Sequence, residues 1–367
     1  MRNRAFRFRI YPTKDQEILI AKTFGCCRFI YNRMLADKIE EYEKTKKAYR
    51  TTPAGYKDEF PWLKEVDSLA LANEQLHLEA AYRNFFIRPE SGYPKYKSRH
   101  RSKRTYTTNV VNGNIELQGK HLKLPKLKKV KIKAHRQIPE GYRLKSVTIT
   151  QEPSGKYYAS LLYEYPEEEN QIVREAENVL GIDYAMKGMG VFSDGRRAEY
   201  PGYYRKAEEK LAREQRKLSK CRKGSANYRK QKRRVALCHE KVRNQRKDHQ
   251  HKLSRRLAEE YDAVAVENLN MKAMSQAMHF GKSVMDNGYG MFLTMLEYKL
   301  KDRGKQLVRV DRRFPSSKRC SRCGRVKKTL GLDERTYVCE CGNVMDRDLN
   351  AAINIREEGK RMMRESA

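Results

Sequence analysis

Four acidic residues stand at positions where a carboxylate is costly unless it binds a cation. Asp183 ends the apolar segment VLGID, Glu267 ends the apolar segment AVAVE, and Asp346 and Asp348 lie in DRDLNAAINI near the C-terminus. A charge at the end of a buried strand needs a partner that offsets its desolvation. Carboxylates that converge from two strand ends and a helix form a site of hard oxygen ligands, which suits Mg²⁺. Two such ions, about 3.5–4 Å apart, can support phosphodiester hydrolysis.

The order of these acids along the chain narrows the chemistry. RNase H-like nucleases have this arrangement, with one acid on the first strand, one after a later strand and one late in the chain. In such a site the metal generates the nucleophile, so no histidine is needed as a base. Each acid taken alone could instead be a solvated turn residue. The three acids together, in this order and with this strand context, favour a two-metal nuclease site.

A second candidate site is formed by cysteines in the last sixth of the chain. Two short spacings, separated by fifteen residues, place thiols at Cys320, Cys323, Cys339 and Cys341. Four thiolates suit tetrahedral Zn²⁺ and leave no open position for water, so this metal would be structural. The second pair has one intervening residue where two are usual, and the alternative is a set of unligated buried cysteines. With no secretory signal in the sequence, the cysteine pattern favours a reducing cytosol.

The charge of the chain indicates a polyanionic partner. Lys and Arg number 80 against 46 Asp and Glu, a net charge of +34, while 39% hydrophobic residues still allow a globular fold. Residues 203–260 alone carry 21 basic and 7 acidic residues. Membrane-surface binding is disfavoured because the basic residues are spread along the chain, and no segment approaches the roughly 18 apolar residues of a membrane span. We therefore expect phosphate contacts from two basic segments, at Lys95, Lys97 and Arg99 and at Arg229, Lys230, Lys232, Arg233 and Arg234.

The elements that position these residues can be outlined from the pattern of apolar residues. Residues 5–10 alternate as in a half-buried strand, and Thr13 with Gln16 forms a capping box that opens a helix to about Thr23. Gly25 is expected to break this helix. Further helical patterns follow in the first 90 residues, around 29–39 and 65–87. Short strands are then expected at 115–117, 122–124, 130–132 and 146–150, with a hairpin turn at 153–155.

The second half of the chain predicts strands and a long helical hairpin. Two strands are expected within 179–199, followed by helices at about 203–220 and 229–260, and then by strands at 262–266 and 306–310. The early strand and the strands after residue 104 together suggest a small barrel or sheet interrupted by a helical insert. The acids of the candidate nuclease site then belong to a separate, later domain.

Taken together, these segments resemble the TnpB family, which is encoded by bacterial and archaeal insertion sequences and related to type V CRISPR effectors. The matching segments occur in family order across nearly the whole chain. They are AFRFRIYPTKDQ, FGCCRFIYNRML, WLKEVDSLALANEQLHLEAAYRNFF, YPKYKSR, GIDYAMKG, KGSANYRKQKRRVA, VENLNM, FPSSKRCSRCG and CGNVMDRDLNAAINI. FPSSKRCSRCG and DRDLNAAINI are the most specific, whereas GIDYAMKG alone would be weak.

The resemblance implies a mixed α+β, multidomain fold. A helical recognition insert at 13–90 interrupts a small β-barrel (wedge) domain formed by 1–12 and 91–172. An RNase H-like (RuvC) α/β nuclease domain follows at 173–315 and 346–367. This domain includes the basic helical hairpin at 203–260 and is interrupted by a zinc-ribbon insert at 316–345.

The resemblance also implies the activity and its residues. By position, the family's catalytic, Mg²⁺-binding acids fall on Asp183, Glu267 and Asp348, with Asp346 a less favoured third member, and its zinc ligands fall on the four cysteines. The implied partners are a guide RNA from the same element and double-stranded target DNA, with no membrane and no small-molecule substrate. The implied location is the prokaryotic cytoplasm, in association with the nucleoid.

Recognition of a short DNA motif beside the target is expected from the helical insert and the adjoining β region. The corresponding residues are Ser68, Leu69 and Ala72, together with Val111 and Asn112. Small or apolar side chains could contact thymine methyls or sugars, and Asn112 could bond an adenine edge. For Leu69 and Ala72, packing within the helix is the alternative.

Two other function classes remain to be weighed against an RNA-guided DNA endonuclease. The first is a nuclease-independent, RNA-guided or DNA-binding regulator of the element, which metal-dependent cleavage of guide-matched DNA would exclude. The second is a transposase that joins DNA ends. It is disfavoured because such enzymes lack this placement of a zinc ribbon and this family resemblance.

Overall fold

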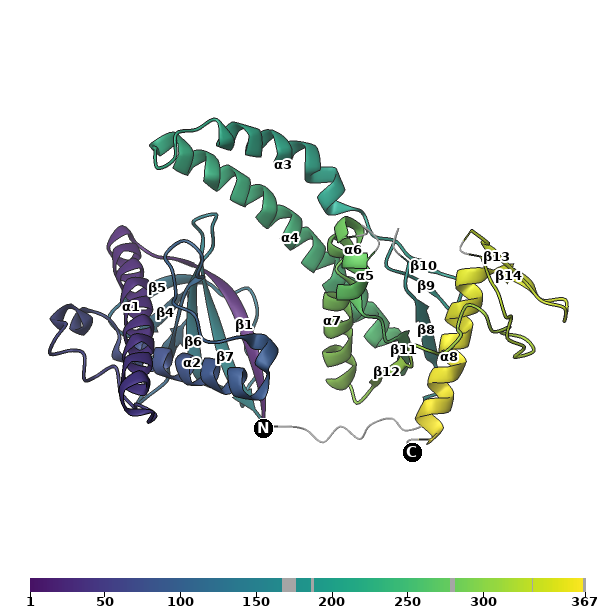
Figure 1. The fold of residues 1–367 in the computed structure, drawn as a ribbon, viewed down its shortest axis with the longest axis horizontal. Helices are drawn as coiled ribbons and strands as arrows, with labels where there is room; N and C mark the ends of the chain where they lie inside the picture. Colours follow the sequence, from purple (N-terminus) through teal and green to yellow (C-terminus); the bar gives the residue numbers. More distant parts are fainter. Residues whose placement is uncertain (167–175, 186–187, 278–280, 332, 366–367) are drawn as a thin grey trace. The chain divides into compact units, whose positions relative to one another are not determined.

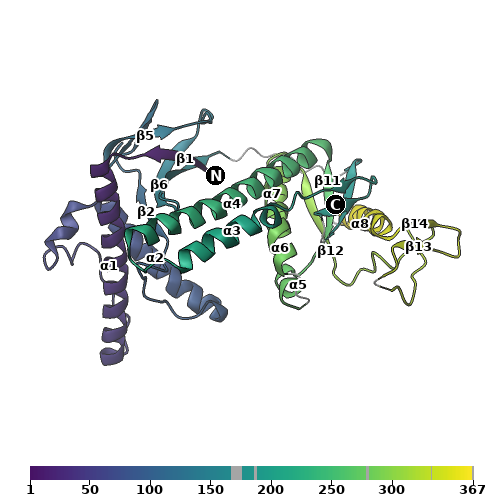
Figure 2. The ribbon, with the colours of Figure 1, turned by 90° about the horizontal axis from the view of Figure 1, so that it is seen from above.

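A computed structural model describes residues 1–166, 176–185, 188–277, 281–331 and 333–365. The chain divides into two compact units, Met1–Glu168 and Glu169–Ala367. Figure 1 shows the helices and strands of each unit, and Figure 2 shows them from above. No helix in the described part of the chain has the length and apolar character needed to cross a membrane.

The first unit is built on a seven-stranded antiparallel sheet with the order β2-β6-β7-β1-β5-β4-β3. The first strand of the chain, β1, lies between β7 and β5, so residues more than a hundred positions apart pair directly, as in Arg2 with Tyr165. In the described residues β2 and β3 are the two edges, so the sheet is curled but open and the expected barrel closure is absent. The strands are β1 (Arg2–Tyr11), β2 (Arg104–Asn109), β3 (Glu116–Gln118), β4 (His121–Leu124), β5 (Lys128–Lys133), β6 (Arg143–Gln151) and β7 (Tyr157–Tyr165).

The helices of the first unit begin at side-chain caps. Helix α1 (Lys14–Thr45) follows Thr13, which forms the predicted capping box with Gln16, and α2 (Ser68–Ile87) follows Asp67, which accepts a hydrogen bond from the N–H of Leu69. Short 3₁₀ helices lie on either side of α2, at Pro61–Glu65 and Pro89–Ser91.

Helix α1 continues through Gly25, where the sequence predicted a break. A glycine within a helix costs only about 1 kcal/mol. The neighbouring Phe24, Cys26 and Cys27 are buried, and this burial offsets the cost. Alternate residues of β1, including Phe8 and Ile10, pack in the same core as the buried faces of α1 and α2.

The second unit is a three-layer α/β/α arrangement. Its sheet has the order β10-β9-β8-β11-β12, in which β8, β11 and β12 run parallel and the short β9 and β10 are antiparallel. The strands are β8 (Val179–Asp183), β9 (Gly190–Phe192), β10 (Arg197–Ala198), β11 (Ala263–Glu267) and β12 (Gln306–Val310), and a separate pair is formed by β13 (Thr336–Val338) and β14 (Val344–Asp346).

Helices cover both faces of this sheet (Figure 1). On one face, α8 (Arg347–Glu365) packs against β8 and β11, with Ala263 and Ala265 in the shared core. On the other face, Val264 and Val266 pack with α4 (Ala226–Glu260) and α7 (Tyr289–Lys301). The remaining helices are α3 (Tyr203–Ser219), α5 (Met271–Ala277) and α6 (Gly281–Asn287).

Two glycines allow α8 to lie unusually close to the sheet. A Cβ added at Gly181 of β8 would overlap the backbone oxygen of Ala352, and one added at Gly359 would lie 2.5 Å from the Cβ of Ala265. Both positions therefore require glycine for steric reasons. This close packing fixes the start of α8, which carries Asp348, relative to the end of β8, which carries Asp183.

Candidate metal sites and nucleic-acid surfaces

The three predicted catalytic acids come to the same edge of the second unit's sheet. Asp183 is the last residue of β8 and Glu267 the last residue of β11. These strands are parallel neighbours, with Ile182 paired to Val266, so the next residue on each strand lies at the same carboxyl end. Asp348 lies in the first turn of α8, which packs along β8. The strand order and the helix thus bring the acids together from three distant parts of the sequence.

The charges of these acids act on one another. Burial raises the pKa of Asp183 well above its usual range, and the carboxylates of Glu267 and Asp348 raise it further, whereas Arg347 opposes the shift. Among the described residues, the three acids do not form a group in which one carboxylate oxygen from each lies within 4.8 Å of the others. Three mutually repelling carboxylates suit cations placed between them, because each cation offsets the repulsion and the desolvation.

A buried tyrosine beside the acids gives a second indication that a polar group fits here. Tyr289, at the start of α7, is 1% exposed, and its Oη has no hydrogen-bond partner among the described residues. Burial raises the pKa of Tyr289, and the carboxylates of Asp183 and Glu267 raise it further, so the hydroxyl lies within the electrostatic influence of the cluster. Buried hydroxyls usually have a partner. A water held by a cation among the acids would supply one.

The structure gives Asp346 a different environment from Asp348. Its Oδ1 accepts a hydrogen bond from the N–H of Leu349 at 2.9 Å, which caps α8, and its Oδ2 accepts from Arg197 Nη2 at 2.9 Å. Both carboxylate oxygens of Asp346 therefore have partners within the fold. Asp348 is the second residue of the helix, with Arg347 Nε 3.4 Å from its Oδ1. This favours Asp348 over Asp346 as the third metal ligand.

The four cysteines form a compact cluster with the geometry of a zinc site. Their sulfur atoms all lie within 4.8 Å of one another, with Cys320 Sγ 3.7 Å from Cys341 Sγ and Cys323 Sγ 3.6 Å from Cys339 Sγ. Four sulfurs, each about 2.3 Å from a central Zn²⁺ at tetrahedral angles, would be about 3.8 Å apart. The observed spacing therefore fits the ion. The second cysteine pair lies in the turn that joins β13 to β14.

Hydrogen bonds within the cluster favour thiolate formation at one cysteine. Burial raises the pKa of the Cys320 thiol, but hydrogen bonds from the backbone N–H groups of Cys323 and Arg322 and from Asn343 Nδ2 outweigh it and lower that pKa to about 6. The thiolate is the form that ligates a metal. At Cys341, by contrast, a bond from the Asn343 N–H lowers the pKa, but burial and hydrogen bonds with the other three thiols outweigh it and raise that pKa to about 11. The hydrogen bonds therefore favour the metal-ligating form at Cys320.

Two asparagines of α8 fasten the cysteine segment to the helix that carries Asp348. Asn350 Nδ2 donates to Arg319 O at 2.7 Å, and its Oδ1 accepts from the N–H of Ser321 at 2.9 Å. One turn later, Asn354 Nδ2 donates to the carbonyls of Ser316 at 2.8 Å and Arg319 at 2.6 Å. These asparagines in DRDLNAAINI bear no predicted chemistry, and sequence reasoning missed their role. The i, i+4 spacing of two asparagines beside the cysteines was the available signal.

The basic hairpin is formed by α3 and α4. The side chain of Gln231 on α4 donates to the carbonyl of Glu214 at 3.0 Å and to its carboxylate at 2.6 Å, which ties the two helices together. The five basic residues predicted here are all exposed: Arg229, Lys230, Lys232, Arg233 and Arg234. Their charged groups are therefore accessible to a phosphate backbone.

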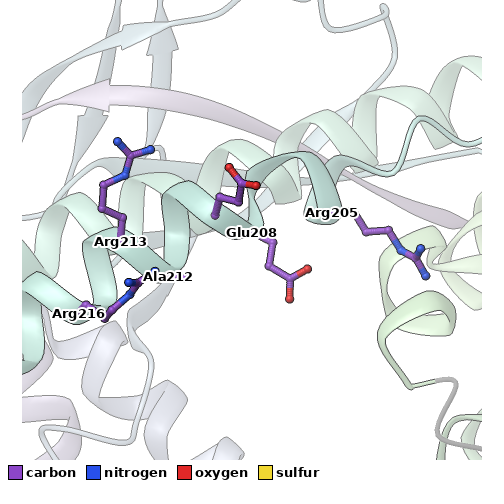
Figure 3. A pocket seen from close by; sticks show the side chains of 6 residues that line it. Arg205, Glu208, Ala212, Arg213 and Arg216 are labelled. Carbon is purple, nitrogen blue, oxygen red and sulfur yellow. The ribbon is translucent and has the colours of Figure 1, made fainter.

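Helix α3 presents a further charged groove, shown in Figure 3. The groove is lined by Arg205, Glu208, Glu209, Ala212, Arg213 and Arg216. Two glutamates offset two of the three arginines, so this face attracts phosphate less strongly than the run of cations on α4.

The basic segment at 94–104 differs in part from the expectation. Lys95 and Arg99 are exposed, but the Lys97 ammonium bonds to the buried Glu74 and lies 4.1 Å from the centre of the Tyr31 ring. Its backbone N–H also donates to Asn32 Oδ1. A buried carboxylate needs a cation, so Lys97 has a structural partner in addition to any contact it makes with phosphate.

The residues predicted to read DNA lie on two surfaces of the first unit. Ser68 and Ala72 are exposed and Leu69 is half-buried on the first turns of α2, where the Ser68 hydroxyl accepts a hydrogen bond from Lys57 Nζ at 2.8 Å. Val111 and Asn112 are exposed in the turn after β2, and Asn112 has a φ of 49°. Both groups are accessible for contact.

Comparison with known proteins identifies the family. A protein from Streptomyces pristinaespiralis, named "Putative RNA-guided DNA endonuclease", is 34% identical over 368 residues, which covers 97% of this chain and 89% of the relative. InsQ of Escherichia coli K12, with the same description, is 30% identical over 384 residues and covers 98% and 92%. The chain belongs to the TnpB family.

Three family models match parts of this TnpB-family chain. They are the IS605 OrfB family, described as "Probable transposase", at 160–278, the "Cas12f1-like, TNB domain" at 289–355, and a "Helix-turn-helix domain" at 1–47. The last description does not match the observed fold, because residues 1–47 form β1 and the single helix α1.

The fold also resembles a solved structure. A Cas12f1 chain, determined by cryo-EM in a complex with sgRNA and target DNA, aligns with a TM-score of 0.59 at 14% identity, over 97% of this chain and 98% of the other. At this identity the likeness concerns the fold alone. It supports a mixed α+β architecture of the kind seen in these effectors.

Proposed function

We propose that this TnpB-family protein is an RNA-guided DNA endonuclease. The observation that carries the proposal is the convergence of Asp183 and Glu267, at the carboxyl ends of two parallel strands, with Asp348 on α8. The chain aligns with most of the length of relatives that are named as putative RNA-guided DNA endonucleases. The proposed partners are a guide RNA and double-stranded target DNA. The net charge of +34 supports such partners, because a guide–target heteroduplex is held through its backbone.

The nuclease domain is proposed to be of the RuvC type. Asp183, Glu267 and Asp348 would hold Mg²⁺, which would supply an activated water and stabilise the leaving oxygen. The residues of the chain then have distinct tasks. The carboxylates would hold the ions, Asp346 and Arg197 hold the start of α8, and α4 with α7 covers the opposite face of the sheet.

The cysteine cluster is proposed to bind one structural Zn²⁺ within a zinc ribbon at 316–345. The sulfur spacing supports the ion, and the bonds from Asn350 and Asn354 would transmit the order of this segment to α8. In the first unit, 13–90 is proposed as the helical recognition insert of a wedge domain formed by 1–12 and 91–172. Its DNA-motif contacts are proposed at Ser68, Leu69, Ala72 and Asn112.

Cleavage of guide-matched DNA tests this proposal. The protein, purified with the RNA it binds in cells that carry its locus, should cut DNA that contains the matched sequence only when Mg²⁺ is present. The Asp183→Ala variant should bind the same RNA and the same target without cutting. Target binding with no cleavage by the wild-type protein would favour the nuclease-independent regulator instead.

A further inference from the structure

Ser316 occupies a buried position beside one of the three acids. The residue is 5% exposed, and its hydroxyl donates a hydrogen bond to Oε1 of Glu267. Its carbonyl accepts a hydrogen bond from Asn354 Nδ2 at 2.8 Å. Its side chain therefore contacts β11, and its backbone is held by α8. Ser316 belongs neither to the acids nor to the cysteines, although it lies in the family-like segment FPSSKRC.

The chemistry of this contact suits an acid that must hold a cation. Glu267 has a longer and more mobile side chain than the two aspartates, so its carboxylate can point in several directions unless it is restrained. A hydroxyl restrains one oxygen without neutralising the charge, whereas an arginine would compete with the cation. With Oε1 held by Ser316, Oε2 is left to face a ligand.

The position of Ser316 is itself fixed by a hydrogen bond from helix α8. Asn354 is 4% exposed, and it bonds the carbonyls of both Ser316 and Arg319, which precedes Cys320. Helix α8 carries both Asn354 and Asp348. A short series of contacts therefore sets the spacing between Glu267 and Asp348. It runs from the Glu267 carboxylate to the hydroxyl and backbone of Ser316, then to Asn354, and along α8 to Asp348.

We propose, within the nuclease function proposed above, that Ser316 is a positioning residue that orients Glu267 for divalent-cation binding. It is not a catalytic residue, because its contact is with the acid and not with reacting atoms. Partners of metal ligands of this kind typically contribute 10- to 100-fold to metal affinity. Ser316→Ala should therefore weaken divalent-cation binding by about 10- to 100-fold.

The chain provides a matched control at the next residue. Ser317 is the same residue type, is half-buried, and makes none of these bonds. Ser317→Ala therefore removes the same atom from the same segment without touching Glu267. Ser316→Thr is the conservative variant, because it keeps a hydroxyl donor at this position.

The test uses the ribonucleoprotein and two kinds of measurement. Cleavage of guide-matched DNA is titrated with Mg²⁺, and Mn²⁺ binding is measured separately by electron paramagnetic resonance, with zinc content and target binding recorded for each variant. We expect Ser316→Ala to need about 10- to 100-fold more Mg²⁺ and to bind Mn²⁺ correspondingly more weakly. Ser316→Thr should recover much of this loss, and Ser317→Ala should behave as wild type.

Two results would overturn the proposal. One is a Ser316→Ala protein whose Mg²⁺ titration and Mn²⁺ affinity equal those of Ser317→Ala. The other is an equal loss in Ser316→Ala and Ser316→Thr together with loss of zinc, which would make Ser316 a packing residue. If the wild-type protein did not cut guide-matched DNA, the proposed function would fail, whereas the Mn²⁺ measurement would still decide the role of Ser316.

Discussion

Replacing Asp346 and Asp348 one at a time separates a helix cap from a metal ligand. In Asp346→Ala, α8 loses the hydrogen bond to Leu349 N–H and the pair with Arg197. Loss of an N-cap costs about 0.5–2 kcal/mol. The pair with Arg197 is more than two-fifths exposed on both sides, so it adds at most about 1 kcal/mol. We therefore expect a total loss of about 0.5–3 kcal/mol in the free energy of unfolding.

Asparagine variants distinguish the two roles more sharply. Asn caps helices about as well as Asp, so Asp346→Asn should retain most of the stability and most of the cleavage. Asp348→Asn removes one of three repelling carboxylates, so the metal-free protein should not lose stability, but cleavage should be abolished. For a unit of this size, 1 kcal/mol shifts Tm by about 2–4 °C. Thermal melting and a guided cleavage assay on all three variants measure both effects.

The opposite ranking would refute this reasoning. An Asp346→Asn protein that melts as wild type but does not cut, beside an Asp348→Asn protein that still cuts, would transfer the ligand role to Asp346. The contacts of Asp346 with Leu349 and Arg197 would then be secondary to metal binding.

Three further predictions concern the zinc cluster, the basic hairpin and the packing of α8. Elemental analysis should find one Zn²⁺ per chain, and native protein without zinc would contradict the proposed zinc site. The Cys339→Ser variant should lose the zinc and cut DNA less well, because the start of α8 would be held less firmly. Reversing the charges of Arg229, Lys230 and Lys232 should weaken RNA binding and flatten its salt dependence while leaving metal content unchanged, and an unaltered salt slope would exclude these contacts. Gly181→Ala should destabilise the protein by about 1–3 kcal/mol through its clash with Ala352. Its matched control, Gly25→Ala, meets nothing within 4 Å and should instead stabilise α1 by about 0.5–1 kcal/mol, so equal melting of the two variants would contradict the packing argument.

The strand-end acids and the capping box could be predicted because their signals are local. An apolar run that ends in an acid identifies both the strand and the point where it ends, as at Asp183 and Glu267. Thr13 and Gln16 are three residues apart, so the start of α1 needs no tertiary information. The cysteine site could likewise be predicted, because the short spacing within each pair of cysteines can be read directly from the sequence.

Other features depend on contacts that local patterns do not contain. Whether α1 continues through Gly25 is decided by the burial of its neighbours. The helices α5 to α7 were not predicted, although the buried residues Tyr289, Phe292 and Leu296 of α7 do recur at helical spacing. The partner of Ser316 lies 49 residues away along the chain. Nothing in the segment FPSSKRC indicates that its first serine contacts Glu267 while its second does not.

The most direct test of the central claim is a cleavage assay with the ribonucleoprotein purified from cells that carry its locus. Its bound RNA is sequenced, a DNA duplex matching the guide segment is built with flanking sequence from the locus, and the wild-type protein is compared with Asp183→Ala in Mg²⁺ and in EDTA. The account predicts that only wild-type protein in Mg²⁺ cuts, and that it cuts only the matched duplex. Cleavage that needs no guide RNA, or that persists in Asp183→Ala, would contradict it.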